Sequence, residues 1–279
     1  VEDFDAKKEV LQALEEIVGE STVLATNTSS LSVTGLAGVL KHPSRFLGLH
    51  FFNPAPLMAL VEVVPAMQTD QHYVVQCLDW MKAWGKIPVQ AKDTPGFIVN
   101  RIARPFYGEA LRIVEEGLAT PNEVDAAMKD VGFKMGPFEL MDLIGNDVNY
   151  AVTKSVFEAF YFDPRYRPSL IQKKHVEAGW LGRKTGKGYY SYQDGKPLES
   201  PVNKTGDWSW IQNRVLAMLM NEAFDALALG IASAPDLELA MTRGVNYPKG
   251  LLEWANECGL DVVLEQLQQL QSSYGEDRY

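Results

Sequence analysis

Residues 46–65 read FLGLHFFNPAPLMALVEVVP and give the clearest indication of the fold. It holds two short apolar runs, Phe46–Phe51 and Leu60–Pro65, whose length and composition predict two buried strands. The flanking segments continue the pattern, with strands predicted over 22–27 and 87–91 and helices over 5–18, 29–40 and 71–84. Strands that alternate with helices at this spacing predict an α/β layer with a largely parallel sheet, which is half of a doubly wound, Rossmann-type fold.

The strand pattern stops after Asp93-Thr94-Pro95-Gly96, and the chain becomes helical in character. Long helical runs are predicted over 97–117, 121–131 and 136–160. A polar stretch with Gly and Pro, 193–206, predicts a linker, after which helical periodicity resumes at Trp208. The predicted parts are therefore 1–93 as the carboxy-terminal half of a Rossmann domain, 94–192 as an all-α domain, 193–207 as a linker, and 208–279 as a second all-α domain.

The two helical segments match each other in register. Asn100-Arg101 corresponds to Asn213-Arg214, and Glu109-Ala110 corresponds to Glu222-Ala223. At the same offset Gly117 and Ala127-Met128 correspond to Gly230 and Ala240-Met241, and after a small insertion Gly136, Glu139 and Gly145 correspond to Gly250, Glu253 and Gly259. We predict that the α part is duplicated, as one pair of copies rather than a longer repeat array.

Composition excludes several classes of protein. The net charge is −10, which argues against broad binding of nucleic acid or an anionic membrane, because those surfaces select clustered Lys and Arg. No apolar run approaches the ~18–20 residues of a membrane span, and no secretory signal pattern opens the chain. The two cysteines, Cys77 and Cys258, lie in predicted helices without a CxxC pair, so we expect neither disulfides nor zinc, and a reducing, cytoplasmic setting.

The beginning of the chain carries a second expectation. Val1-Glu2-Asp3-Phe4 resembles the end of a buried strand, and neither GxGxxG nor GxxxxGK[ST] occurs anywhere in the sequence. The glycine-rich run Gly182–Gly188 has the wrong spacing for either motif. We therefore expect the chain to lack the amino-terminal part of its dinucleotide-binding domain.

Polar side chains gather where predicted strands end. Asn27-Thr28-Ser29-Ser30 and His50 to Asn53 lie where two of these strands end and loops begin, and ligands of parallel α/β layers bind at that edge. Glu62 lies inside another strand, and a buried carboxylate needs a partner, for which a neighbouring imidazole such as His50 is suited. Such a pair fixes the tautomer of the histidine and leaves its second nitrogen to take a proton. On pattern alone the alternative stays open, with His50 a satisfied core histidine and Glu62 facing solvent.

Five strings carry a family resemblance: ATNTSSL (25–31), HFFNPAPLMALVEVV (50–64), KDTPGFIVNR (92–101), MGPFELMDLIG (135–145) and GRKTGKGYYSY (182–192). They recur along the chain in the order typical of the 3-hydroxyacyl-CoA dehydrogenases, which they strongly resemble. The duplicated helices resemble the longer bacterial members that act on 3-hydroxybutyryl-CoA or 3-hydroxyadipyl-CoA, and no residue decides between these substrates. The resemblance implies NAD as cofactor, an acyl-CoA substrate and oxidation of a 3-hydroxyl group by hydride transfer.

The resemblance also implies roles for individual residues. His50 would be the general base and Glu62 would orient it, while Ser29 and Asn100 would hydrogen-bond the substrate oxygens, with Asn100 reaching across an interdomain cleft. Contacts to the cofactor would come from Glu2, Lys7, Asn27, Asn53 and, with a weaker match, Lys184. Helical segments of this kind commonly build a dimer interface in the family, although a second copy in the same chain could cover that face instead.

Three other interpretations remain. The chain could be a non-catalytic helical dimerisation module with an inert α/β part, or the dehydrogenase part of a larger β-oxidation enzyme. It could also be another β-hydroxyacid dehydrogenase, although those resemble this chain less, because they generally use a catalytic Lys in place of a strand His paired with Glu. If the dinucleotide fold is truncated as expected, the 279-residue chain should show little activity alone.

Overall fold

The structure, a computed structural model, describes residues 2–198 and 207–279. The described chain divides into two compact units. The first unit contains residues up to Arg101 together with Phe224–Val245, and the second contains Ile102–Ala223 and Asn246–Tyr279. The predicted domain ranges run without interruption along the chain, so this division cuts across them; most of the predicted linker, 199–206, lies outside the described residues.

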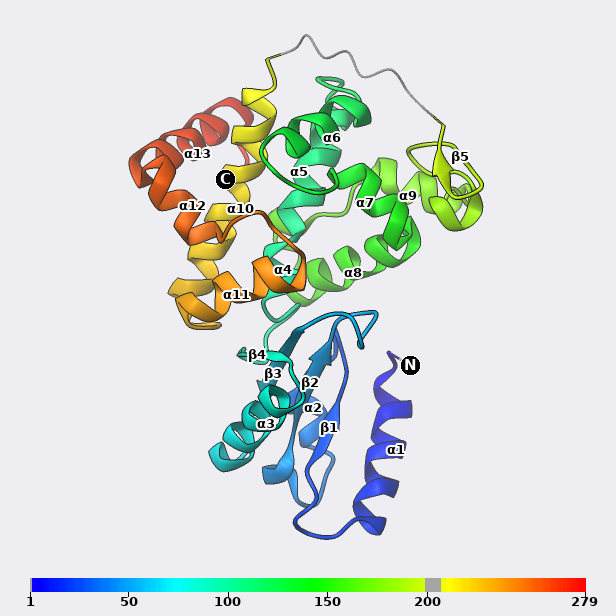
Figure 1. Ribbon diagram of the computed structural model, residues 1–279, viewed down its shortest axis with the longest axis vertical. Helices are drawn as coiled ribbons and strands as arrows, with labels where there is room; N and C mark the ends of the chain where they lie inside the picture. The colour runs from blue at the N-terminus through cyan, green and yellow to red at the C-terminus, as the bar shows by residue number, and fades with distance from the viewer. Residues whose placement is uncertain (1, 199–206) are drawn as a thin grey trace. The chain divides into compact units, whose positions relative to one another are not determined.

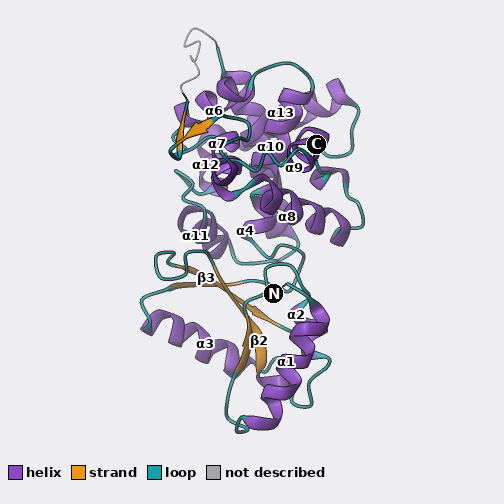
Figure 2. Ribbon diagram, turned by 90° about the vertical axis from the view of Figure 1, so that its right-hand side faces the viewer, coloured by secondary structure: helices purple, strands orange, loops and turns teal. Residues whose placement is uncertain are grey.

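The first unit is a four-stranded sheet with helices on both faces (Figures 1 and 2). The strands are β1 (Leu24–Thr26), β2 (Phe46–Phe51), β3 (Leu60–Pro65) and β4 (Ile87–Gln90), adjacent in that order. The helices are α1 (Phe4–Ile17), α2 (Val33–Ala37), α3 (Gln71–Ala83), α4 (Val99–Ile102) and α11 (Ala234–Gly244), with a 3-10 turn at Pro43–Arg45. The α/β fold class predicted from the sequence is confirmed.

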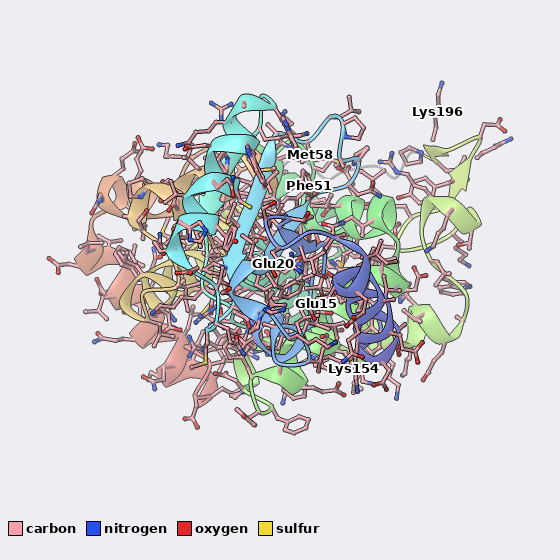
Figure 3. All side chains as sticks on the ribbon, turned by 90° about the horizontal axis from the view of Figure 1, so that it is seen from below. Glu15, Glu20, Phe51, Met58, Lys154 and Lys196 are labelled. Atoms are coloured by element: carbon pink, nitrogen blue, oxygen red, sulfur yellow. The ribbon has the colours of Figure 1, made fainter. Side chains whose placement is uncertain are left out.

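One pair of strands is antiparallel within the sheet that the sequence predicted to be largely parallel. β1 and β2 are parallel, as are β3 and β4, but β2 and β3 are antiparallel. The reason is the length of their connection, because residues 52–59 are too few for a parallel crossover, which needs about a dozen residues or more. Phe51 and Met58, at the two ends of this connection, are labelled in Figure 3. The chain therefore reverses direction between β2 and β3.

Side chains of β3 point alternately to the two faces of the sheet, and helices cover both faces. Val63 packs in a buried cluster with Leu47 of β2 and with Val74 and Cys77 of α3. Leu60 points to the other face, where it adjoins Gly244 of α11. A strand buried on both faces explains why LVEVV is almost continuously apolar, and why its one carboxylate needs partners inside the protein.

The second unit is helical. Its helices are α5 (Arg104–Glu115), α6 (Pro121–Asp130), α7 (Pro137–Ile144), α8 (Asn146–Ala159), α9 (Leu170–Glu177), α12 (Leu251–Cys258) and α13 (Leu260–Tyr274), while α10 (Ser209–Ala228) begins here and ends in the first unit. The predicted run over 136–160 is two helices, because Gly145 adopts φ 102° between α7 and α8. The predicted helix over 29–40 is reduced to the short α2. Part of the predicted linker forms a small hairpin, β5 (Tyr192–Gln193) with β6 (Lys196–Pro197).

The repeat seen in the sequence recurs in the backbone. α6, α7 and α8 correspond to α11, α12 and α13 in order and in length. The glycines between the last two helices of each copy share one unusual conformation, with φ 102° and ψ 126° at Gly145 and φ 89° and ψ 124° at Gly259. The second copy does not stay together, since α11 packs against β3 and β4 of the first unit. Duplication of the α part is therefore supported, although the two copies are used differently.

Two further findings concern what the described residues contain. Among them no helix is long and apolar enough to cross a membrane, and no group of three or more His, Cys, Asp or Glu is placed to hold a metal ion. Both cysteines are free thiols, with Cys77 buried in α3 and Cys258 exposed in α12. Burial raises the pKa of the Cys77 thiol to about 11, which keeps it protonated and unreactive at neutral pH.

Candidate active site

His50 and Glu62 form a hydrogen-bonded pair within the sheet. They face each other in the register of β2 and β3, and His50 Nδ1 lies 2.6 Å from Glu62 Oε2. The carboxylate is fully buried and the imidazole is only 7% exposed. The rings of Phe52 and Phe97 lie against the imidazole, with centroids 4.6 and 5.7 Å away. This arrangement holds the ring in one orientation and makes the sequence-based alternative, a solvent-facing Glu62, wrong.

The second oxygen of Glu62 is also occupied. Oε1 accepts hydrogen bonds from the backbone N–H groups of Ile98, at 3.0 Å, and Val99, at 2.9 Å. These amides are available because the chain turns at Gly96 and Phe97, which both adopt positive φ, 76° and 47°. A side chain at Gly96 would also crowd the backbone of Arg101. The turn at TPGF (94–97) thus leaves the two backbone amides that follow it free to partner the buried carboxylate, and the sequence-based reasoning missed these two amides.

The loop after β1 is organised around Glu2. Its Oε1 accepts hydrogen bonds from Thr28 Oγ1 at 2.6 Å, from the N–H of Ser29 at 2.7 Å and from the N–H of Ser30 at 2.9 Å. Burial acts to raise the pKa of Glu2, but these hydrogen bonds outweigh it and lower the pKa below the ordinary value. The other oxygen lies 3.7 Å from Lys7 Nζ. Glu2, Lys7 and Ser29, predicted separately from the sequence, therefore form one connected group.

Asn27 links the ends of two strands, because its Oδ1 accepts a hydrogen bond from the N–H of Phe51 at 2.8 Å. It lies at the carboxyl end of β1, beside the end of β2 that carries His50. Asn53 lies just beyond β2, is exposed, and precedes a cis proline. The structure thus brings Asn27, Ser29 and His50 to the strand edge that the sequence predicted.

Asn100 and Lys184 belong to different compact units. Asn100 lies in α4 and belongs to the same compact unit as His50, whereas the sequence assigned it to the helical domain. Lys184 belongs to the second unit, where its ammonium group lies 2.6 Å from Asp147 Oδ1. Asn100 is therefore part of the unit that contains the sheet, and its contact with the substrate stays a prediction.

Asp93 is a positioning residue that the sequence-based analysis overlooked. Its carboxylate accepts hydrogen bonds from the N–H groups of Val33, at 3.0 Å, and Thr34, at 2.6 Å, and from Ser32 Oγ at 3.2 Å. It therefore caps the amino end of α2, the helix between β1 and β2, although Asp93 lies sixty positions after Val33 in the chain. A lone Asp before a Thr-Pro-Gly turn gives no sign of such a distant partner.

A Rossmann-type layer with a polar strand edge and a buried His–carboxylate pair indicates an NAD-dependent dehydrogenase. Family models give the same assignment: residues 1–94 match the NAD binding domain of 3-hydroxyacyl-CoA dehydrogenase. Residues 96–192 and 210–279 both match the C-terminal domain of that enzyme. The chain therefore belongs to the 3-hydroxyacyl-CoA dehydrogenase family, whose cofactor is NAD. The first match begins at Val1, so the expectation that the chain lacks the amino-terminal part of this domain is not supported.

Named relatives and solved structures agree with this assignment. The chain is 38% identical to 3-hydroxyadipyl-CoA dehydrogenase of Escherichia coli, over 100% of the chain and 77% of that protein. It is 44% identical to the mitochondrial hydroxyacyl-coenzyme A dehydrogenase of Sus scrofa, over 69% of the chain and 62% of the relative. The crystal structure of 3-hydroxybutyryl-CoA dehydrogenase from Escherichia coli K12 matches with a TM-score of 0.92 and 37% identity, covering 100% of the chain and 77% of that structure.

Proposed function

We propose that the protein catalyses the NAD-dependent oxidation of (3S)-3-hydroxyacyl-CoA to 3-oxoacyl-CoA, with His50 as general base and Glu62 as its orienting partner. The observation that supports this most is the 2.6 Å contact between His50 Nδ1 and Glu62 Oε2 at the sheet edge. Family membership supplies the reaction class, and the contact supplies the group that would remove the proton. The alternative, an inert helical module, does not explain why the buried carboxylate of Glu62 is fully hydrogen-bonded and contacts His50.

The chemistry of the pair follows from its geometry. Because Nδ1 is engaged by Glu62, Nε2 is the imidazole atom left to accept the proton of the substrate hydroxyl. The imidazolium formed in that step is stabilised by the carboxylate at 2.6 Å, in surroundings from which water is largely excluded. The amides of Ile98 and Val99 keep Glu62 from turning toward another partner.

The residues at the end of β1 fit the proposed cofactor. Bound NAD would accept the hydride from C3 of the substrate. The nearby donors and acceptors are mostly uncharged, namely the amides of Asn27 and Asn53 and the hydroxyl of Ser29, which suit a carboxamide and a ribose. Glu2 and Lys7 hold this loop in shape, and we propose that they line the same site. Ser29 and Asn100 would bind the substrate oxygens, and Lys184 would meet an anionic part of the cofactor.

The names of the relatives bear on the acyl group of the substrate. The two Escherichia coli relatives are named for different substrates, 3-hydroxyadipyl-CoA and 3-hydroxybutyryl-CoA. We propose an acyl-CoA substrate with a short 3-hydroxyacyl group, unsubstituted or with a terminal carboxylate. Steady-state rates with both thioesters decide between them.

The helical repeat bears on association between chains. In the second unit Arg214 of α10 lies 3.0 Å from Glu109 of α5, and both side chains are buried. We propose that the second copy covers, within one chain, part of a face that a single copy would offer to a partner. Homo-oligomerisation through other helical faces remains a prediction, and sedimentation equilibrium measures it directly.

The test of the catalytic proposal uses the full chain with acetoacetyl-CoA and NADH. We expect His50→Gln and Glu62→Gln to lower kcat by about 10²- to 10⁴-fold, as removal of a general base does. His72→Gln is the matched control, because His72 is an exposed histidine of α3 in the same unit. Unchanged turnover in His50→Gln, with folding retained, would contradict the proposal and favour the non-catalytic interpretation.

A further inference from the structure

Asp142 of α7 is a buried carboxylate that organises the loop over residues 182–192. Its Oδ1 accepts hydrogen bonds from Asn146 Nδ2 at 2.9 Å and from the N–H of Tyr189 at 3.1 Å. Its Oδ2 accepts from the N–H of Tyr190 at 3.0 Å and from the phenol of Tyr192 at 2.9 Å. The side chain is fully buried, and three of these four donors come from the loop itself. One carboxylate therefore fixes the end of the GRKTGKGYYSY motif.

The glycines of the motif pack against the same residue. A side chain at Gly182 would overlap the backbone of Asp142, and one at Gly188 would overlap its carboxylate. Gly182 also requires a positive φ of 96°, which other residues rarely adopt. Both ends of the segment 182–188 are thus held against Asp142, and this close approach explains why the motif has glycine at these two positions.

Lys184 lies between those two glycines. It sits in the 3-10 turn Arg183–Thr185, and its Nζ lies 2.6 Å from Asp147 Oδ1 in the first turn of α8. The adjoining residue Asn146 donates its backbone N–H to Leu181 O at 3.2 Å, so the start of α8 and the start of the loop are tied together. The two side chains of the Lys184–Asp147 pair are 44% and 39% exposed, so an anionic ligand can compete with Asp147 for the ammonium group.

We propose that Asp142 is the positioning residue for Lys184: it holds the loop 182–192 so that the ammonium group is presented at one fixed place to an anionic group of the cofactor. This inference rests on the proposed function of Lys184. Asp142 itself touches no ligand in this proposal. It acts by accepting four hydrogen bonds that keep the loop closed on the corner between α7 and α8.

The isosteric variant Asp142→Asn tests the positioning step without any ligand. An amide nitrogen cannot accept, and at either oxygen position it would face two donors, so the variant loses two of the four hydrogen bonds. We expect amide exchange over 182–192 to accelerate by tenfold or more, with exchange in α13 unchanged. The matched control is Asp261→Asn, an exposed aspartate in the first turn of α13. Unchanged protection of the loop in Asp142→Asn would overturn the inference.

Binding of NADH to the full chain tests the link to the cofactor. We expect Asp142→Asn and Lys184→Ala each to weaken the binding of NADH about tenfold. The double variant should bind no more weakly than Lys184→Ala alone, because a general structural defect would add to that loss and a positioning defect would not. Lys154→Ala, which removes an exposed lysine of α8 paired with Glu158, is the control (Figure 3).

The two readouts separate the two possible failures. If Lys184→Ala binds NADH as wild type does, the proposed role of Lys184 is wrong, while the exchange experiment still decides whether Asp142 holds the loop. If the losses in Asp142→Asn and Lys184→Ala add in the double variant, Asp142 is a stability residue and the positioning inference fails.

Discussion

His50 and Glu62 are directly opposite residues of the antiparallel β2–β3 pair, and this register brings Nδ1 of one within 2.6 Å of Oε2 of the other. Opposite residues on one face of such a pair have Cβ atoms about 5 Å apart, which is within reach of a histidine and a glutamate. A slip of one residue would place Val61 or Val63 opposite His50 and turn the carboxylate to the other face. The short connection between the strands therefore determines both the strand direction and the pair.

The hydrogen bonds of Glu62 predict that two substitutions at this position lower the free energy of unfolding by different amounts. Glu62→Gln retains an acceptor for the amides of Ile98 and Val99, whereas Glu62→Ala leaves both buried N–H groups without it. We expect Glu62→Ala to lower the free energy of unfolding by about 1–3 kcal/mol more than Glu62→Gln does. Urea denaturation of both variants measures this difference. Equal stability would show that the TPGF turn does not depend on the carboxylate.

Asp125 predicts a pH-dependent stability of the second unit. Burial raises the pKa of Asp125 to about 7 from 3.8, while hydrogen bonds from Tyr190 and Phe138 act in the opposite direction. Between these two values the folded protein binds a proton that the unfolded chain releases. This contribution to the free energy of unfolding therefore falls as pH rises from about 4 to 7, with a slope of up to ~1.4 kcal/mol per unit.

Asp125→Asn removes this titration, so the stability of the variant should depend less steeply on pH than that of wild type. Other groups titrate alike in both proteins, and the difference between the two curves isolates Asp125. Thermal or urea unfolding at pH 5 and pH 7.5 provides the comparison. Parallel curves would mean that Asp125 is not the group responsible.

Replacement of glycine by alanine is expected to change stability in opposite directions at two positions of the second unit. A side chain at Gly136 would overlap Asp125, whose carboxylate accepts the N–H of Phe138 at 2.8 Å, so Gly136→Ala should destabilise by about 1–3 kcal/mol. Gly108 lies within α5 with open space around its Cα, so Gly108→Ala should stabilise by about 0.4–1 kcal/mol. Denaturation midpoints test both. Loss of stability in Gly108→Ala would contradict the open space found at that position.

The buried ion pair of α10 and α5 predicts a large loss on breaking it. Arg214 donates to Glu109 at 3.0 Å and to Glu116 at 2.6 and 3.0 Å, and its removal would leave the carboxylate of Glu109 buried with weaker partners. We expect Arg214→Met to cost about 3–5 kcal/mol of unfolding free energy. The double variant with Glu109→Gln should cost less than the sum of the two single changes. Additive losses would mean that the two residues act independently.

The sequence predicted the strands over 46–51 and 60–65 with their bounds, because short apolar runs bordered by proline have few other solutions. It also indicated His50 and Glu62 as partners, since a carboxylate in an apolar strand must be compensated. It did not predict the break at Gly145, because helical periodicity continues across that residue. Nor did it predict that α11 leaves its own copy of the repeat to cover β3 and β4, since a helix with one apolar face does not encode which surface it covers.

The amino-acid sequence was sufficient to predict the family, the α/β layer followed by duplicated helices, and the residue types available for chemistry, because motifs and apolar periodicity are local properties of the chain. The folded structure was needed to establish the antiparallel pairing of β2 with β3, the two amides on the second oxygen of Glu62, and the four donors on Asp142. These features depend on which buried polar atoms meet. A buried carboxylate must be satisfied, but the chain does not specify by whom until distant segments pack together.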